Sequence, residues 1–389
     1  MDFPTLRWWG SPFKISNRND RKKMKKKIIM SVVVLLVVFV GFISCAILPR
    51  LGSLPKGKHL EEISLSPNYD GRKFQNINPT PMRTESIWKM FSQPSHGKQK
   101  PKGAIPAVNT DLFALDPQED LLIWFGHSSC FLQLKEKRFL IDPVFSAYAS
   151  PVSFANRAFE GTDTYKSEDI PDIDYLIITH DHWDHLDYNT VRELRSQTGK
   201  VICPLGVSGH FVRWGYDASD IIEMDWNDTA TLDASIEIHC LPARHSSGRG
   251  LRHKKTLWAS FLLKGGTQTV FVSGDSGYDT HFAEIGKRLG PIDFALLENG
   301  QYNTSWKYIH MQPEETLQAG IDLRTRLIIP MHNSKFSMSS HKWDEPLRRI
   351  TAGNDTLANP QRLLTPRIGE IVLLKDTTQS FSRWWEEVE

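Results

Sequence analysis

An apolar run that ends in a cluster of histidines and aspartates is the feature that most restricts the fold of this chain. Residues 176–179 read Leu-Ile-Ile-Thr, a sequence typical of a buried strand. His180 and His182 follow two residues apart, so an extended segment points both imidazoles the same way. Asp184 and His185 come where the chain must turn. Because imidazole and carboxylate groups suit zinc and similar divalent metals, this loop predicts ligands for two adjacent ions.

The later ligands follow from a resemblance: the loop at 180–185 is similar to the metal loop of the metallo-β-lactamase superfamily, whose two-metal sites need three more ligands, a histidine, a bridging aspartate and a last histidine. Three later strand-like runs supply a candidate for each, in order: His245, Asp275 and His332. Open α/β sheets place their sites at such strand ends. A lone histidine or aspartate there is more often a hydrogen-bonded turn residue, but the combination with the first loop favours a ligand. The resemblance therefore implies a binuclear metal site with these ligands: His180, His182, Asp184, His185, His245, Asp275 and His332.

The motif His-x-His-x-Asp-His at 180–185 resembles the metal loop of the metallo-β-lactamase superfamily. Further motifs resemble the branch that holds N-acyl-phosphatidylethanolamine-hydrolysing phospholipase D and its bacterial relatives. They are Trp-Phe-Gly-His-Ser-Ser at 124–129, Leu-Ile-Asp-Pro at 140–143, Pro-Ala-x-His at 242–245, Gly-Asp-Ser-Gly-Tyr at 274–278 and Tyr-Ile-His-Met-Gln-Pro-Glu-Glu at 308–315. The match covers about residues 105 to 375. One departure is that Asn333 and Ser334 follow the last histidine, where the branch usually has Trp-Gly, which bears on the substrate more than on the chemistry.

The resemblance implies an α/β fold of the metallo-β-lactamase type, an αββα sandwich with two sheets packed face to face and helices outside. It also implies two Zn²⁺ ions, with other divalent metals as alternatives. The first ion would be held by His180, His182 and His245, the second by Asp184, His185 and His332, with Asp275 as the bridge. The residues expected to take part in catalysis are Asp184, Asp275 and His310. His310 would donate a hydrogen bond to the phosphate or the leaving group; its alternative role is a supporting or capping residue.

Three further side chains have candidate roles near the metals. Asp142 and His127 are expected to orient the ligands from behind. Arg249 is expected either to pair with a phosphate or to be a solvated loop residue.

Metal chemistry favours one substrate class. A zinc ion lowers the pKa of bound water to about 7, and a second ion about 3.5–4 Å away polarises the substrate oxygen. Two cations also offset the negative charge of a phosphate diester. The leading hypothesis is therefore a phosphodiesterase of phospholipase D type acting on N-acyl-phosphatidylethanolamine-like lipids. The alternatives are a metal-dependent hydrolase of a lactone or cyclic phosphodiester, and a non-catalytic binding protein on the same fold. The complete ligand set argues against the last.

A basic cluster precedes a long uncharged run near the N-terminus. Residues 18–27 are mostly Lys and Arg, and residues 28–48 carry no charge. At about 1.5 Å per residue, a helix of about 21 residues spans a bilayer core of about 30 Å. The positive-inside rule then predicts a cytoplasmic N-terminus and a catalytic domain outside the cytoplasm. A signal peptide, with or without lipidation at Cys45, is the alternative, and Met24 is an alternative start.

Composition agrees with one large globular domain plus appendages, since 40% of residues are hydrophobic and 24% charged. The net charge of +2 gives no reason to expect a nucleic-acid partner. The expected partners are a phospholipid or other phosphodiester substrate and the membrane; the sequence does not indicate an oligomeric state. The predicted organisation is a basic segment at 1–27, a transmembrane anchor at 28–48, a connecting strap at 49–104 and a metallo-hydrolase domain at 105–389.

Periodicity and turn signals predict the elements of that domain. Strands are predicted at 121–125, 129–134, 137–142, 175–179, 200–203, 236–240, 257–263, 268–273, 293–297, 326–330 and 370–374. Helices are predicted at 188–196, 206–214, 279–288, 313–321 and 343–351, with a short one at 85–91 in the strap.

Overall fold

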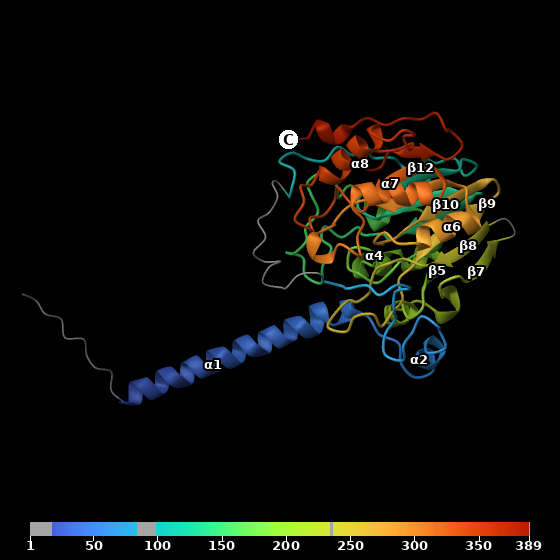
Figure 1. Cartoon of the computed structure of the whole chain (residues 1–389). Coiled ribbons are helices and arrows are strands. Elements are labelled where there is room, and N and C mark those ends of the chain that lie inside the picture. The colour runs from blue at the N-terminus through green and yellow to red at the C-terminus, as the bar shows by residue number, and fades with distance from the viewer. Residues whose placement is uncertain (1–17, 84–98, 234–235, 389) are drawn as a thin grey trace, which may run out of the picture. The chain divides into compact units, whose positions relative to one another are not determined.

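A computed structural model of the chain describes residues 18–83, 99–233 and 236–388 (Figure 1). The chain divides into two compact units, Met1–Arg50 and Leu51–Glu389. In the first unit, helix α1 (Arg18–Phe42) continues into a π-helical turn at Ile43–Ile47. The segment Lys22–Leu51 is long and apolar enough to cross a membrane, a test that an N-terminal signal sequence also passes.

Two sheets make up the second unit. In the described part of the chain, the first sheet has the strand order β13-β1-β2-β3-β4-β5-β6 and the second β12-β11-β10-β9-β8-β7. The first consists of β1 (Leu121–Trp124), β2 (Cys130–Leu134), β3 (Lys137–Ile141), β4 (Ile173–Ile177), β5 (Thr198–Pro204), β6 (Ile221–Met224) and β13 (Ile371–Leu373). The second consists of β7 (Thr229–Asp233), β8 (Ile236–Leu241), β9 (Ser260–Gly265), β10 (Gln268–Val272), β11 (Ile292–Glu298) and β12 (Thr325–Met331).

Parallel pairing brings strand ends to a common edge in each sheet. Strands β3, β4, β5 and β6 are parallel neighbours in the first sheet. Strand β11 is parallel to both β10 and β12 in the second, while β7, β8, β9 and β10 pair antiparallel. The carboxyl ends of β4, β10 and β12 therefore each lead into a loop at the edge of a parallel group, where such sheets form their sites.

Alternation along β4 shows how the two sheets bury their faces. Ile177 belongs to the core between the sheets, together with Phe261 and Leu296 of the second sheet. Leu176 points to the opposite face and packs with Val191 on the helical side. Successive strand residues point to opposite faces, so a strand covered on both sides must be apolar throughout. Residues 175–178 meet this requirement, and Asp174, near the start of the strand, is only half-buried.

Helices cover the outer face of each sheet. Helices α4 (Tyr188–Glu193) and α5 (Ser208–Arg213) pack on the first sheet. Helices α6 (His281–Leu289) and α7 (Pro313–Asp322) pack on the second (Figure 1), and α8 (Glu345–Asp355) contacts α7. The predicted αββα sandwich is confirmed.

Some elements differ from the prediction. Strands β6 and β7 were not predicted, because one is a four-residue, half-buried strand and the other an exposed sheet edge. The predicted strand at 257–263 begins only at Ser260, since the preceding backbone bonds to other loops, as Ala259 N does to Thr179 O at 3.0 Å. The strap contains a helix, α2 (Gly57–Ile63), on which only Ile63 is buried, so its sequence carries little helical periodicity. The helix predicted at 85–91 lies outside the described residues.

Candidate metal centre

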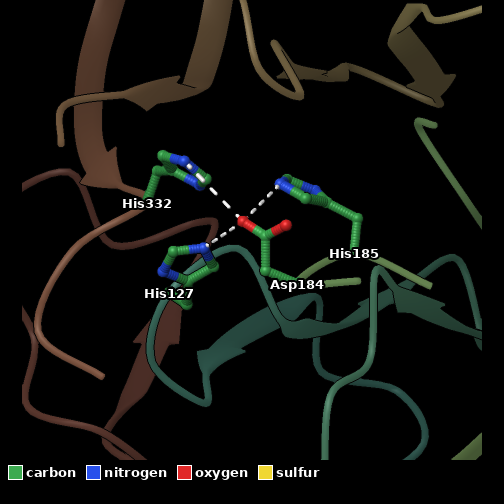
Figure 2. Close-up of side chains that lie close together, drawn as sticks. All are labelled: His127, Asp184, His185 and His332. Carbon is green, nitrogen blue, oxygen red and sulfur yellow. Dashed lines mark hydrogen bonds and ion pairs between the residues drawn. The ribbon is translucent and has the colours of Figure 1, made fainter. Parts of the chain in front are cut away.

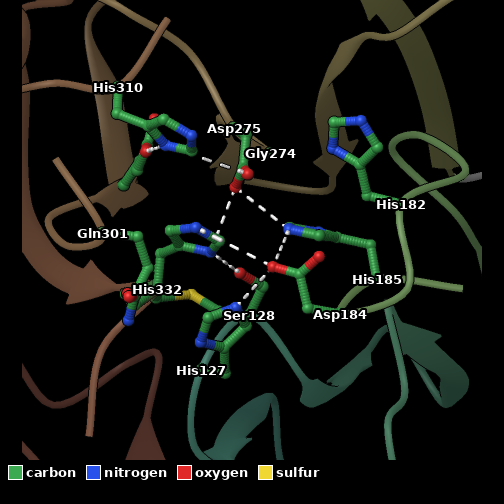
Figure 3. Close-up of polar contacts among 12 residues, drawn as sticks. His127, Ser128, His182, Asp184, His185, Gly274, Asp275, Gln301, His310 and His332 are labelled. Atoms are coloured by element: carbon green, nitrogen blue, oxygen red, sulfur yellow. Dashed lines mark hydrogen bonds and ion pairs between the residues drawn. The ribbon is translucent and has the colours of Figure 1, made fainter. Parts of the chain in front are cut away.

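Four loops carry the predicted ligands to one place. The first follows β4, and the others follow β8, β10 and β12. The seven side chains lie together at the carboxyl ends of these strands. Six of them are buried, and His182 is half-buried. Figure 3 shows most of this cluster.

Three imidazoles and one carboxylate form a first group. Nε2 of His180 lies 2.9 Å from Nδ1 of His182, and Nε2 of His245 lies 3.2 Å from the same atom. Oδ2 of Asp275 is 3.6 Å from Nε2 of His245. One donor atom from each of the four residues lies within 4.8 Å of all the others.

A second group surrounds Asp184 (Figure 2). Its Oδ2 lies 3.6 Å from Nε2 of His185 and 4.0 Å from Nε2 of His332. His127 joins this group, with Nε2 2.8 Å from Asp184 Oδ2. His127 thus contacts a predicted ligand directly, in agreement with its expected supporting role.

Asp275 lies between the two groups (Figure 3). Its Oδ2 faces His180 and His245 at 3.9 and 3.6 Å. Its Oδ1 lies 3.1 Å from both His185 and His332. One carboxylate therefore faces donors of both groups, which is the arrangement expected of a bridging ligand.

The donor set fits a divalent metal. Nε2 of His185 and Oδ1 of Asp275 are buried and face each other at 3.1 Å, but the angles are not those of a hydrogen bond. Buried polar atoms without partners are costly, and convergent nitrogen and oxygen donors are those that zinc and related ions take. Burial also holds the pKa values of His180, His245 and His332 well below the usual range, so these imidazoles are neutral and offer lone pairs.

Neighbouring groups fix the ligands in place. Asp142 accepts hydrogen bonds from His185 Nδ1 at 2.8 Å and from Thr179 N and Oγ1 at 2.8 and 2.6 Å. Ser128 Oγ lies 2.9 Å from His332 Nδ1, and His245 Nδ1 lies 2.9 Å from a backbone carbonyl. Such partners orient metal-binding imidazoles and select the tautomer. Asp142 therefore lies where the sequence placed it.

His310 lies at the edge of the cluster and pairs with a residue that the sequence analysis missed. Its Nδ1 forms a short contact with Glu298, and it lies 4.0 Å from Oδ2 of Asp275. Glu298 is the last residue of β11 and is 1% exposed. The sequence did contain a signal for Glu298, because this carboxylate stands at the end of an apolar strand and the other site residues also lie at strand ends.

Arg249 is not the solvated loop residue that was one of its two expected roles. It is 4% exposed, so it is not a solvated loop residue. Its guanidinium donates to the backbone carbonyls of Asp181 and Leu186, and it lies 4.0 Å from the ring centroid of Trp183. Arg249 therefore holds the first metal loop from behind, and stacking against an aromatic ring suits a guanidinium there.

The strap segment 51–83 contacts the metal loops. Asn76 Nδ2 donates to the carbonyl of His245 at 2.9 Å, and the N–H of His245 donates to Asn76 Oδ1 at 3.0 Å. Asn78 donates to Asp279 at 3.0 Å, four residues beyond Asp275. The N–H of Ser53 donates to His210, whose other ring nitrogen lies 3.1 Å from Asp181 in the first metal loop. These residues are part of the site's support rather than a loose connection.

A cavity of about 850 Å³ opens above the cluster. Its polar floor includes His182, Asp184, Asp275, His310 and His332. Its apolar wall consists of Met82, Ala149, Pro151, Trp183, Trp306, Ile309 and Met338. An apolar cavity with a few convergent polar groups is the usual form of a small-molecule site.

Comparison with known proteins agrees with this geometry. The family described as "Beta-lactamase superfamily domain" matches residues 137–333. An uncharacterized protein of Mycobacterium tuberculosis is 36% identical over 298 residues, which cover 74% of this chain and 79% of that protein. The N-acyl-phosphatidylethanolamine-hydrolyzing phospholipase D 1 of Caenorhabditis elegans is 32% identical over 232 residues, 57% of this chain and 65% of that protein.

The solved structure of a metallo hydrolase from the archaeon Ignicoccus hospitalis shares the fold, with a TM-score of 0.50 and 20% identity over 66% of this chain and 98% of that one. The matched family and its relatives place the chain among the metal-dependent hydrolases of this fold, and the clustered donors agree with that class. The chain belongs to the metallo-β-lactamase superfamily.

Proposed function

We propose that the protein is a membrane-anchored phosphodiesterase of phospholipase D type that acts on N-acyl-phosphatidylethanolamine-like lipids. The observation that carries the proposal is the position of Asp275 between two groups of donors on the floor of an apolar cavity. The similarity to a relative named for hydrolysis of such lipids supports the substrate class.

Two metal ions, most suitably Zn²⁺, complete the site in this proposal. His180, His182 and His245 would hold one, Asp184, His185 and His332 the other, and Asp275 both. Bound there, the ions would supply an activated water and positive charge to offset that of a phosphate diester.

His310 is the proposed proton donor for the departing oxygen. Burial opposes a charge on its ring, but the adjacent Glu298 carboxylate raises the pKa of His310 above its usual value. His310 also lines the cavity, so a protonated ring there is within reach of a substrate. A positioned general acid contributes roughly 10²–10⁴-fold to a rate.

The cavity wall is suited to the apolar parts of a lipid. The side chains of Met82, Trp306 and Met338 surround the polar floor. Apolar surface removed from water contributes roughly 25 cal/mol per Å², so an acyl chain gains more from this wall than a sugar or nucleotide would.

The first unit is proposed to anchor the enzyme. Its apolar residues 28–48 follow the basic cluster at 18–27, which by the positive-inside rule remains in the cytoplasm. The metallo-hydrolase domain would then lie outside the cytoplasm, joined to the anchor by residues 49–104.

The test is hydrolysis by the purified, zinc-loaded protein. N-acyl-phosphatidylethanolamine in detergent micelles should release phosphatidic acid, and bis(p-nitrophenyl) phosphate should release nitrophenol. A lactone and a cyclic phosphodiester serve as competing substrates. Rapid opening of the lactone with both diesters untouched would overturn the phosphodiesterase assignment. Binding of metal and lipid without any turnover would instead indicate a non-catalytic protein.

A further inference from the structure

Two lysines line the active-site cavity beside the predicted metal ligands. Lys73 comes from the strap, and Lys254 comes from the loop that follows His245. Both line the cavity whose floor includes Asp184 and Asp275. Neither is among the residues that the family resemblance pointed to.

The backbones that carry the two lysines are bonded to each other. The N–H of Phe74 donates to the carbonyl of Lys254 at 2.8 Å, and the N–H of Lys254 donates to the carbonyl of Ser247 at 3.0 Å. Phe74 is fully buried in the core between the sheets, so its neighbour Lys73 is held at a fixed point. Lys254 itself has a φ of 60°, an uncommon value for a residue with a side chain. Such conformations concentrate at functional sites.

Neither ammonium group forms an ion pair with a carboxylate in the described part of the chain. Asp70 accepts from the backbone N–H groups of Arg72 and Lys73 at 2.8 Å and from Gln75 at 2.7 Å, and the charge of Lys73 also helps to lower the pKa of this carboxyl group. Burial and the charge of Lys73 together lower the pKa of Lys254. Two like charges held close together provide a favourable place for an anion.

The lysines are also close to the proposed reaction centre. Asn76 bonds to both backbone groups of His245, and Lys73 lies three residues before Asn76. Three residues extend over at most about 11 Å, so the backbone of Lys73 lies no farther than that from Asn76, which is bonded to the metal loop.

We propose that Lys73 and Lys254 form a subsite for a second anionic group of the substrate, next to the phosphodiester that is cleaved. This inference rests on the proposed function and names a lipid class within it: N-acylated phospholipids whose head group carries a carboxylate, such as N-acyl-phosphatidylserine. N-acylation matters because a free amino group would bring a positive charge, which both lysines repel. The N-acylated serine head group brings only negative charge.

The test compares two lipids that differ by one carboxylate. The double variant Lys73→Gln/Lys254→Gln is assayed with N-acyl-phosphatidylserine and N-acyl-phosphatidylethanolamine in identical micelles. We expect the KM for the serine lipid to rise about five-fold or more, the KM for the ethanolamine lipid to change less than about two-fold, and kcat to stay unchanged for both. The matched control is Lys287→Gln/Arg288→Gln on α6, which also removes two positive charges, but outside the cavity lining. The variant Lys73→Arg/Lys254→Arg should behave like the parent.

A binding measurement separates this inference from the proposed reaction. Calorimetry with the zinc-loaded protein compares N-acetyl-O-phosphoserine with N-acetyl-O-phosphoethanolamine, neither of which needs to be hydrolysed. The parent should bind the serine compound at least about five-fold more tightly, and the glutamine variant should bind both equally. Equal binding by the parent refutes the subsite, and so does an equal rise in KM for both lipids, because the lysines would then act on the shared phosphate or the lipid surface. If neither lipid is hydrolysed but the binding preference is present, the proposed reaction fails and the subsite stands.

Discussion

Replacing Asn76 with alanine tests whether the strap supports the metal centre. The Asn76 side chain bonds to the N–H and the carbonyl of His245, at 3.0 and 2.9 Å, and accepts from the indole N–H of Trp258 at 3.1 Å. His245 is 1% exposed, so its backbone groups would lose their partners in a nearly dry environment. The loop of a proposed ligand would then no longer be fixed.

The bonds set the size of the effect. Each buried group left without a partner costs about 1–3 kcal/mol, so the two groups of His245 bound the loss at about 2–6 kcal/mol. Asn76 is only half-buried, so water can enter its place and replace some of the lost hydrogen bonds. We therefore expect a loss of unfolding free energy near the lower end of this range. Loss of groups that orient a ligand weakens metal binding about 10–100-fold, equivalent to about 1.4–2.7 kcal/mol. We therefore expect this loss of affinity, with a comparable loss of stability.

Chelator competition measures the zinc affinity, and denaturant unfolding of the metal-free protein measures the stability. The matched control is Asn68→Ala, another half-buried strap asparagine, whose side chain donates to Asp225 at 2.9 Å rather than to a metal loop. It should leave zinc affinity within about two-fold of the parent value. If Asn76→Ala binds zinc as tightly as Asn68→Ala does, the strap does not support His245 and the reasoning is wrong.

Four further changes have defined outcomes. Asp275→Ala should lose at least one metal ion and nearly all activity, which elemental analysis and the diester assay would show. His310→Ala should keep its metals but cleave diesters roughly 10²-fold or more slowly, whereas His332→Ala should lose metal. Full activity of the His310→Ala variant would show that His310 has a structural role only. Burial lowers the pKa of Lys335 to about 8, below its unfolded value of about 10.4, so the folded state releases this proton first as pH rises. Relative to Lys335→Met, the unfolding free energy of the parent should therefore increase by about 2 kcal/mol between pH 8 and pH 10.4, as urea titrations at each pH would measure. Alkaline phosphatase fused to the C-terminus should be active, because this reporter folds only after export. An inactive phosphatase fusion, together with fluorescence from a C-terminal reporter that folds only in the cytoplasm, would contradict the orientation.

The fold and the grouping of the proposed ligands were accessible from the sequence because both depend on local patterns. Residues 176–178, shortly before His180, are all apolar and pack alternately on the two faces of the sheet, which identifies a strand covered on both faces. The ligands follow such strands directly, so predicting the strands also predicts where the donors lie. The structure brings these donors together, while their role as ligands stays a prediction.

The supporting contacts were not accessible because they join segments far apart in the chain. Nothing near Asn76 in sequence indicates that its amide lies against His245, since the two are 169 residues apart. Arg249 was misjudged for a similar reason: its partners Trp183 and the carbonyls of the first metal loop determine that it is buried. Glu298 had a local signal, but its contact with His310 depends on how the loop that carries His310 packs against the end of β11.

The long-range bonds of the strap also constrain the order in which the enzyme can mature. Ser53 bonds to a residue 157 positions later, and Asn78 to one 201 positions later. During synthesis these strap residues emerge first, yet their partners exist only once the chain has been extended past Asp279. Contacts of such sequence separation form late and slowly. The metal loops therefore acquire their final rigidity at the end of folding, so metal capture should follow completion of the domain rather than guide it.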